Sequence, residues 1–288
     1  MEGFLLNDTD WINDFKEKRT QYGVSQNRLS VMAGVSREYV SRIESGKVTL
    51  TEEIKGKFTD ALEKLNPDNP LEMLFDYVRI RFPTQDVRHV VEDILKLRLD
   101  MMIHEDYGFY SYAEHYVLGD VFVLASPDKE KGTLLELKGK GCRQMESYLL
   151  AQHRSWYDFL MDALVEGGVM KRLDLAINDM AGILDIPELT EKCNHEECIS
   201  VFRSFKSYRS GELVRSNEQD KYGMGNTLYI GSLKSEVYFC IYEKDYEQYV
   251  KYDIPIEDTK IKNRFEIRLK NERAHYAVRD LLTYYDAE

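Results

Sequence analysis

The chain has 288 residues, of which 43% are hydrophobic and 12% aromatic, so it can fill a core and lacks the composition of a disordered chain. Its net charge of -12 argues against a protein that coats nucleic acid through bulk attraction, although a site-specific DNA enzyme needs only a local basic surface. No apolar run approaches the ~18 residues of a membrane span, and no charged-then-apolar leader opens the chain. We therefore expect a cytoplasmic protein that engages no membrane. Its four cysteines are too few for a disulfide framework.

Two domains are predicted from a change of sequence texture near residue 67. Residues 1–66 have helical patterns throughout, and the Asn-Pro-Asp-Asn-Pro cluster at 66–70 is of the kind that ends helices and marks linkers. Strand-like stretches follow at residues 75–82, 108–116, 121–126 and 133–138. We predict an α+β protein, with an all-α domain over 1–66 and, over 67–288, a mostly antiparallel sheet with packed helices.

A short helix, a tight turn and a second helix are expected inside the first domain. Ser25 and Ser36 can cap the two helices, and Gly34 supplies the turn between them. The second helix runs to about residue 45 and leaves polar side chains outside. The first helix is expected to turn three apolar side chains inward, which are Leu29, Met32 and Ala33.

Residues 12–65 resemble the five-helix module of the lambda-repressor-like helix-turn-helix class. The resemblance rests on Ser-Gln-x6-Ala-Gly-Val-Ser at 25–36 and on Arg-Ile-Glu-Ser-Gly at 42–46. It implies that the second helix enters the major groove of DNA, with Arg37, Ser41 and Arg42 available for bases or phosphates. Gln26 stands where the class has a glutamine that buttresses the DNA backbone. A helical bundle used for protein contacts is the alternative interpretation.

Three strands of the second domain carry charge on one face only. Their residues alternate between polar and leucine- or isoleucine-rich positions, which is typical of half-buried antiparallel strands. The polar side chains on the three faces are Glu136 and Lys138; Arg172, Asp174 and Asn178; and Arg264, Glu266, Arg268 and Lys270.

Each of these three faces holds one carboxylate beside basic neighbours. If the strands are adjacent in the sheet, Glu136, Asp174 and Glu266 would converge as a hard-oxygen site for a divalent cation, Mg2+ or Mn2+. Such a cation can polarise a scissile phosphate and orient it for attack. Solvated faces without a metal are the alternative, since spacing in sequence does not show convergence.

A tyrosine-rich hairpin is predicted from residues 227–232 and 237–244. Tyrosine is a good strand former, so most of the chain's 20 tyrosines are expected to be structural. Tyr242 is a candidate nucleophile because Lys244 and Glu247 can flank its phenol, and a nearby cation favours the phenolate. On chemistry alone, Tyr229 and Tyr246 remain close competitors.

A basic segment precedes this hairpin at residues 200–211. Arg203, Lys206 and Arg209 repeat every three residues, and each follows an aromatic residue. Basic groups that track phosphates, with rings available for stacking, are typical of single-stranded DNA binding. A solvated amphipathic segment is the alternative.

Five motifs, in order along the chain, resemble the replication-initiation-factor family. The family comprises initiators of staphylococcal rolling-circle plasmids and relaxases of integrative conjugative elements in Gram-positive bacteria. The resemblance covers about residues 74–288, and the helix-turn-helix in front is similar to that of the conjugative-element relaxases. The motifs are Leu74-Phe75-Asp76-Tyr77, Lys171-Arg172-Leu173-Asp174-Leu175-Ala176, Tyr229-x-Gly231, Ile241-Tyr242-x-Lys244-x-x-Glu247 and Phe265-Glu266-Ile267-x-Leu269-Lys270.

The resemblance implies a site- and strand-specific nick at an origin, with a tyrosine left joined to the 5′ phosphate of the cut strand. The freed 3′ end would prime rolling-circle replication, or the bound strand would be passed on in conjugative transfer. The family's nucleophile falls on Tyr242, and two acidic positions of its pattern fall on Asp174 and Glu266, while Glu136 matches less securely. The implied partners are double- and single-stranded DNA at an origin and a host helicase.

Two departures from the family pattern affect these expectations. The plasmid initiators tend to have an arginine two residues before the nucleophile, where this chain has Cys240, so charge stabilisation there must come from elsewhere. The chain also stops at Glu288, just after a helix-like stretch at 274–285, where relatives usually continue. A fragment that lacks C-terminal segments for recognition or helicase contact is the expectation that follows.

Histidine and cysteine spacing favours carboxylates over these residues as metal ligands. The six histidines never occur in the His-hydrophobe-His spacing of one widespread class of relaxases. Cys193, His195 and Cys198 lack a second ligand pair, so a zinc site is not expected.

Two other classes of function stay open on the sequence. A helix-turn-helix transcriptional regulator of a mobile element would place a ligand-sensing domain behind the DNA-binding domain. A metal-dependent DNA hydrolase would use the carboxylates but leave no covalent adduct.

Overall fold

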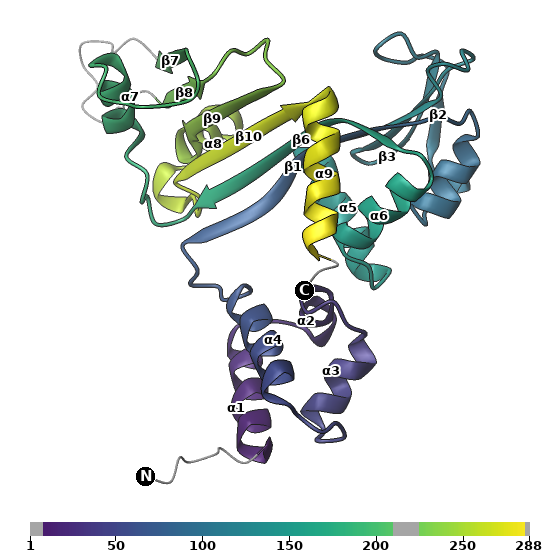
Figure 1. Cartoon of the computed structure of the whole chain (residues 1–288), viewed down its shortest axis with the longest axis vertical. Coiled ribbons are helices and arrows are strands. Elements are labelled where there is room, and N and C mark those ends of the chain that lie inside the picture. Colours follow the sequence, from purple (N-terminus) through teal and green to yellow (C-terminus); the bar gives the residue numbers. More distant parts are fainter. Residues whose placement is uncertain (1–7, 210–224, 286–288) are drawn as a thin grey trace.

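Four helices form a bundle at the N-terminal end of the computed structural model, which describes residues 8–209 and 225–285 (Figure 1). Ser36 caps α3 as predicted, because its side chain accepts a hydrogen bond from the backbone N–H of Tyr39. The expected fifth helix is not found in residues 8–66, since the chain beyond residue 63 forms turns up to the proline-containing cluster. The helices are α1 (Asp8–Gln21), α2 (Gln26–Met32), α3 (Arg37–Glu44) and α4 (Glu52–Glu63).

The bundle has a small core of its own. Phe15, Leu29 and Phe58 are buried there, with side chains from all four helices around them. The predicted inward position is confirmed for Leu29 and Ala33, both buried, but it is wrong for Met32, whose side chain is 44% exposed. Met32 is the last residue of α2, and its side chain lies outside the core, whereas the next residue, Ala33, lies in it.

One antiparallel sheet follows the bundle, and its described strands stand in the order β2-β3-β4-β5-β1-β6-β10-β9-β8-β7. The predicted α+β class and the β8–β9 hairpin are confirmed. The strand predicted at 108–116 is wrong in its first half, because Tyr110 and Ser111 adopt positive φ values, which end an extended strand. The strands are β1 (Leu71–Phe82), β2 (Ile103–Glu105), β3 (Glu114–Leu118), β4 (Val121–Ala125), β5 (Thr133–Lys138), β6 (Val169–Asp179), β7 (Phe205–Arg209), β8 (Asn226–Ile230), β9 (Val237–Glu243) and β10 (Asn263–Lys270).

Three helices cover one face of the sheet, namely α5 (Gly139–Ala151), α6 (Trp156–Val165) and α9 (Asn271–Tyr285) (Figure 1). Leucine and valine side chains of β1, β5, β6 and β10 pack beneath them in the main core. The apolar faces predicted for β5, β6 and β10 are therefore confirmed, and the charged faces lie on the opposite side. None of the described helices combines the length and apolar character that a membrane span requires.

Two further helices lie at the β7–β9 end of the sheet. Helix α7 (Ile186–Asn194) packs on β8 and β9, and α8 (Lys244–Tyr252) follows β9 directly. Shorter helical turns occupy His89–Ile94, Leu99–Met101 and Ile256–Asp258. At the other side, the bundle contacts α5 where the Asn27 side chain donates a 2.8 Å hydrogen bond to the carbonyl of Leu150.

Asp179 organises the end of β6, next to the first residue of β10. Its fully buried carboxylate accepts hydrogen bonds from the backbone N–H groups of Ala181, Gly182 and Leu184 and from the Asn263 side chain. Burial acts to raise the pKa of Asp179, but these hydrogen bonds outweigh it and hold the pKa below its usual value. The ionised carboxylate thus ties β6 to the start of β10.

We expect Asp179→Asn to lower the free energy of unfolding by about 2–3 kcal/mol, because the backbone donors lose a charged acceptor. Urea unfolding followed by Trp156 fluorescence measures this in a Trp11→Phe background, which leaves one of the chain's two tryptophans. Asp253→Asn, at an exposed residue, is the matched control, with an expected change below about 0.5 kcal/mol.

The difference between wild type and Asp179→Asn should depend on pH in a defined direction. A lowered pKa in the folded state gives a contribution that is complete above the unfolded pKa of about 3.9. It is lost as the pH falls through the lower folded value. A difference that already disappears between pH 7 and pH 5 would contradict this assignment.

Candidate active site

The charged faces predicted for β5, β6 and β10 lie on one side of the sheet, together with side chains of β1 and β9. Residues directly opposite on neighbouring strands share a face, and the register sets Arg79 opposite both Glu136 and Arg172. On the next strands Arg268 lies opposite Asp174. Strand β1 separates β5 from β6, so the three strands are not all adjacent, and the condition set for their convergence is not met for β5.

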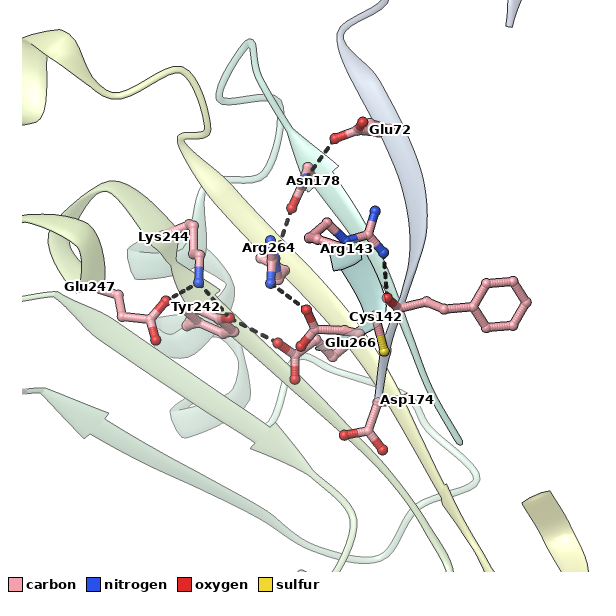
Figure 2. A network of polar contacts seen from close by, with 12 residues as sticks. Glu72, Cys142, Arg143, Asp174, Asn178, Tyr242, Lys244, Glu247, Arg264 and Glu266 are labelled. Carbon is pink, nitrogen blue, oxygen red and sulfur yellow. Dashed lines mark hydrogen bonds and ion pairs between the residues drawn. The ribbon is translucent and has the colours of Figure 1, made fainter. Parts of the chain in front are cut away.

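Tyr242 lies near the end of β9, on this charged face. Its phenol oxygen donates a 2.8 Å hydrogen bond to Oε1 of Glu266 on the adjacent β10. The Lys244 ammonium, at the start of α8, donates to the same phenol oxygen over 3.4 Å and forms an ion pair with Glu247 (Figure 2). Lys244 and Glu247 therefore flank the phenol, as the sequence predicted.

The surroundings of Tyr242 keep its phenol protonated. Burial raises the pKa of Tyr242, the negative charge of Glu266 raises it further, and the positive charge of Arg264 only partly offsets them. The predicted stabilisation of the phenolate by a nearby cation is therefore outweighed in the resting site. A nucleophilic Tyr242 would need a proton acceptor, and Glu266 already accepts its hydrogen bond.

Arg264 brings a positive charge next to Tyr242. It lies directly opposite Tyr242 on β10 and is only 8% exposed. Its guanidinium donates to the Asn178 side chain over 2.7 Å (Figure 2). It also donates to Asp76 over 2.9 Å. The alternation in β10 predicted which face of the sheet Arg264 lies on. No sequence signal indicated that Arg264 would lie opposite Tyr242, in a chain that has Cys240 where the plasmid initiators tend to have an arginine.

Asp76 is a second site residue without a predicted role. The register between β1 and β6 shifts between Phe75 and Tyr77, so Asp76 lies in a bulge. The bulge lets its carboxylate reach Arg264 on β10, across the intervening β6. The sequence signal that could have identified Asp76 was its position in the first family motif, Leu74-Phe75-Asp76-Tyr77.

Asp174 and Glu266 share one guanidinium. Arg268 forms a 2.6 Å ion pair with Oε2 of Glu266 and lies 3.8 Å from Asp174, which is itself paired with Arg172 over 2.6 Å. Both carboxylates are at most 2% exposed. Burial raises the pKa of Asp174, although Arg172 and Arg268 oppose that shift.

Glu136 belongs to a separate group on the other side of β1. It accepts hydrogen bonds from the Tyr77 phenol, from Arg79 at 2.5 Å and from Tyr110 at 2.9 Å. Burial opposes ionisation, yet these donors lower the pKa of Glu136 below its usual value. Its partners thus account for this carboxylate without a metal.

The predicted convergence of Glu136, Asp174 and Glu266 on one cation is not observed, because the inserted strand β1 and the arginines separate them. Among the described residues, the only group of three or more potential ligands with atoms within 4.8 Å of one another is His104, Asp106 and Glu114. That group lies at the β2–β3 edge. As a set of three, the predicted carboxylates do not fit one metal ion, whereas Asp174 and Glu266 already bracket a positive charge.

A pocket of about 360 Å³ opens beside the phenol of Tyr242. Tyr229 and Tyr246 line the same pocket, together with Glu247 and Arg268. Burial, with the Cys240 thiol as neighbour, raises the pKa of Tyr229 to about 12. All three tyrosines weighed from the sequence therefore meet at one cavity, and the hydrogen bond to Glu266 distinguishes Tyr242.

Part of the basic segment, Phe205–Arg209, forms the exposed strand β7, which is the last of the described strands at this edge and pairs with β8 beside the pocket. Residues 210 and 211 of the segment lie outside the part of the chain that the structure describes. Lys206 lies opposite Tyr229 on β8, and the ring of Tyr208 contacts that of Tyr229 edge-on at 5.8 Å. Side chains alternate along a strand, so Lys206 and Arg209 point to opposite faces, and Arg203 precedes the strand. The three basic residues therefore do not form one stripe, since a three-residue repeat does not match the two-residue repeat of a strand.

Three of the four residues predicted to contact DNA in the bundle are exposed, and the fourth forms a hydrogen bond within the bundle. Arg37, Ser41 and Arg42 are exposed on α3. Gln26 is half-buried and donates a 2.8 Å hydrogen bond to Glu44, the carboxylate that Arg19 also holds. Gln26 thus links the start of α2 to the end of α3.

Comparison with known proteins matches three successive parts of the chain. Residues 15–63 match a helix-turn-helix family, residues 72–162 match the N-terminal domain of rolling circle replication initiation proteins, and residues 168–288 match the replication initiation factor family. A Bacillus subtilis (strain 168) protein named "Putative DNA relaxase NicK" is 45% identical over 220 residues. The match covers 76% of this chain and 61% of that relative, so the chain spans less than two thirds of its length.

A solved structure is also similar to this fold. The rolling circle replication initiator protein from Geobacillus stearothermophilus superimposes with a TM-score of 0.60 at 25% identity, over 74% of this chain and 79% of that one. The order of the matched segments agrees with the order of the helical bundle, the first strands and the tyrosine-bearing half of the sheet. The chain is thus similar to the replication initiation factor family over residues 168–288, with a match to a rolling-circle initiator N-terminal domain and a match to a helix-turn-helix family ahead of that part.

Proposed function

We propose that this protein nicks one DNA strand at an origin of transfer or replication and keeps the 5′ phosphate on Tyr242. The observation that carries the proposal is the phenol of Tyr242 in an open pocket, hydrogen-bonded to Glu266 and flanked by Lys244. The relatives support the class of reaction, since one is named a DNA relaxase and the other a rolling circle replication initiator. The product would initiate conjugative transfer or rolling-circle replication.

The first step would transfer a proton as the new bond forms. Tyr242 Oη attacks the scissile phosphorus, and its proton passes to Oε1 of Glu266 along the existing 2.8 Å hydrogen bond. The bond from phosphorus to the 3′ oxygen breaks, so the strand is divided into a 5′ phosphotyrosine and a free 3′ end. Because the pKa of Tyr242 is raised, this proton acceptor is what makes the neutral phenol a competent nucleophile.

The leaving 3′ oxygen needs a proton, and Lys244 would supply it. Its ammonium lies 3.4 Å from the phenol oxygen, close to where phosphorus would be attacked. Glu247 is a positioning residue, because it pairs with Lys244 and Lys251 and so orients the ammonium. In the reverse reaction the roles exchange, and the 3′ hydroxyl reseals the strand.

Arg264 and Arg268 would stabilise the charge that develops on the phosphate. Both guanidiniums lie on the face that carries Tyr242, and Arg268 lines the pocket. Guanidinium groups match the geometry of phosphate oxygens and cannot lose their charge at neutral pH. They therefore take the place of the arginine that the family pattern has at Cys240.

A divalent cation, Mg2+ or Mn2+, is part of the proposal as a cofactor. Asp174 and Glu266 would hold it, because their oxygens suit such a cation and already share the positive charge of Arg268. When bound, the cation would polarise the scissile phosphate. Glu136 is not included, since Tyr77, Arg79 and Tyr110 hold it beyond β1.

Two surfaces would bind the DNA partners. Exposed Arg37, Ser41 and Arg42 on α3 suit double-stranded DNA at the origin, and an acidic net charge does not prevent such local contact. Lys206, on the edge strand next to the pocket, suits the single strand that reaches Tyr242. A helicase partner remains a prediction from the family resemblance.

We expect Tyr242→Phe to abolish a covalent DNA adduct, because the phenol oxygen is the atom that bonds to phosphorus. The measurement is incubation with a labelled single-stranded origin oligonucleotide and Mn2+, followed by SDS electrophoresis to detect protein-linked DNA. Tyr229→Phe and Tyr246→Phe are matched controls from the same pocket and should retain the adduct.

Several outcomes of that experiment would overturn the proposal. Adduct formation by Tyr242→Phe would move the nucleophile to another residue. Cleavage by the wild-type protein without any adduct would identify a metal-dependent hydrolase. Binding of duplex DNA with neither cleavage nor adduct, on any cognate origin, would indicate a transcriptional regulator.

Glu266→Gln should slow nicking by about 10²–10⁴-fold, since it removes the proton acceptor while keeping the side-chain shape. Single-turnover rates at saturating Mn2+ separate this effect from weaker cation binding. Glu243→Gln, another glutamate that lines the pocket, should stay within a few fold of wild type. A loss below tenfold in Glu266→Gln would show that another group accepts the proton.

Cation binding should depend on Asp174 and not on Glu136. We expect Asp174→Asn to weaken Mn2+ binding at least about tenfold in calorimetric titration, with Glu136→Gln close to wild type. An equal loss in both variants would restore the three-carboxylate site. Loss of binding only in His104→Ala would place the cation at the β2–β3 edge instead.

A further inference from the structure

Two cysteine sulfurs lie side by side at the end of α7. The Sγ atoms of Cys193 and Cys198 are 3.4 Å apart, and both cysteines are free thiols. Cys193 is 7% exposed and belongs to a small core cluster, whereas Cys198 is exposed to solvent. One sulfur of the pair is thus reachable from outside, and the other is held in place by packing.

The backbone brings these sulfurs together through a tight reversal at the helix end. Glu196 adopts a left-handed conformation with φ 60°, and the N–H groups of Glu196 and Glu197 donate to the carbonyls of Cys193 and Lys192. Left-handed backbone is unfavourable for a residue with a Cβ, so the turn is held by these hydrogen bonds. The reversal directs Cys198 back over Cys193.

The pair lies behind the strand that carries Tyr242. Cys193 packs with Ile186, Leu228 and Ile241, and Ile241 directly precedes Tyr242 in β9. The chain beyond Cys198 then leads into the edge strand β7, and Ser204 accepts a hydrogen bond from the Gly231 backbone N–H. A covalent link at this point would join α7 to the segment that enters β7.

We propose that Cys193 and Cys198 form a redox-active dithiol that closes to an intramolecular disulfide under a peroxide-class oxidant. Closure needs the sulfurs to approach from 3.4 Å to about 2.05 Å, a movement within reach of the exposed end of the turn. A zinc site is not supported, because the cysteines and His195 are not among the described groups with ligand atoms in mutual range.

The reaction balances in two steps. The Cys198 thiolate takes one oxygen from hydrogen peroxide to give a sulfenic acid, and the peroxide is reduced to water or hydroxide. The Cys193 thiol then attacks the sulfenic sulfur, the S–S bond forms, and a second water leaves. Two electrons pass from the two thiols to one peroxide. Burial and the neighbouring Cys198 raise the pKa of Cys193 to about 11, which favours Cys198 as the first site of attack.

This inference does not rest on the proposed nicking activity, because its readout is covalent connectivity. Thiols are counted in denaturant before and after the folded, reduced full chain is treated with hydrogen peroxide and residual oxidant is removed. Four thiols should fall to two, and a thiol reductant should restore all four. Catalysis by Tyr242 can fail while this result stands, and the reverse also holds.

Proteolysis identifies the linked pair. Glu196 and Glu197 lie between the two cysteines, so cleavage after glutamate separates them into two peptides that stay joined only by a disulfide. Mass spectrometry without reduction should show that joined product, lighter by two hydrogens than the sum of the two peptides. Cys240→Ser keeps the pair and should give the same linked product, whereas Cys198→Ser should give none.

Three results would overturn the proposal. The thiol count could stay at four after oxidation of the folded protein. The linked peptide could instead join Cys198 to Cys142 or Cys240, or to a second copy of the chain, seen as a reducible dimer on electrophoresis. Cys198→Ser could lose two thiols as wild type does, which would place the disulfide elsewhere.

Discussion

The burial of one sheet face beneath α5, α6 and α9 is the constraint on which the site depends. Leucine and valine side chains of four central strands turn toward those helices, so every alternate residue must point the other way. That geometry collects arginines, carboxylates and tyrosines from strands distant in sequence on one continuous face. Tyr242 and Glu266 meet there because β9 and β10 are neighbours. The grouping of polar side chains at the site therefore follows from the packing of the apolar side chains on the opposite face of the sheet.

Ion pairs then determine which carboxylates and arginines lie together on that polar face. Glu136, Asp174 and Glu266 are each at most 2% exposed, and a carboxylate removed from water needs a partner. Arg79, Arg172 and Arg268 supply the partners. The same pairing that stabilises these buried charges keeps Glu136 apart from the other two. It also places the Arg268 guanidinium at the pocket beside Tyr242, so this residue would serve both stability and the proposed reaction.

Local sequence patterns predicted most helices and strands, but they did not predict contacts that depend on strand order and register. Alternation located β5, β6 and β10, and Ser36 located the start of α3, because both signals act within a few residues. The strand predicted at 108–116 was wrong in its first half, because positive φ at Tyr110 and Ser111 ends the extended backbone that the composition suggested. The contact between Asp76 and Arg264 could not be predicted. It depends on a bulge in β1 and on the strand order that brings together two residues 188 positions apart in the sequence.

By itself the sequence determined the α+β class, the helix-turn-helix ahead of a sheet and the polar faces of three strands, and its family motifs made Tyr242 the candidate nucleophile. Only the tertiary structure decided which polar residues meet. It set β1 between β5 and β6, placed Arg264 opposite Tyr242, and gave the phenol a carboxylate acceptor in place of a cation-stabilised phenolate. The physical reason is that hydrophobic alternation specifies the face of each side chain, whereas strand order and register specify its neighbours, and charges act over the few ångströms between neighbours.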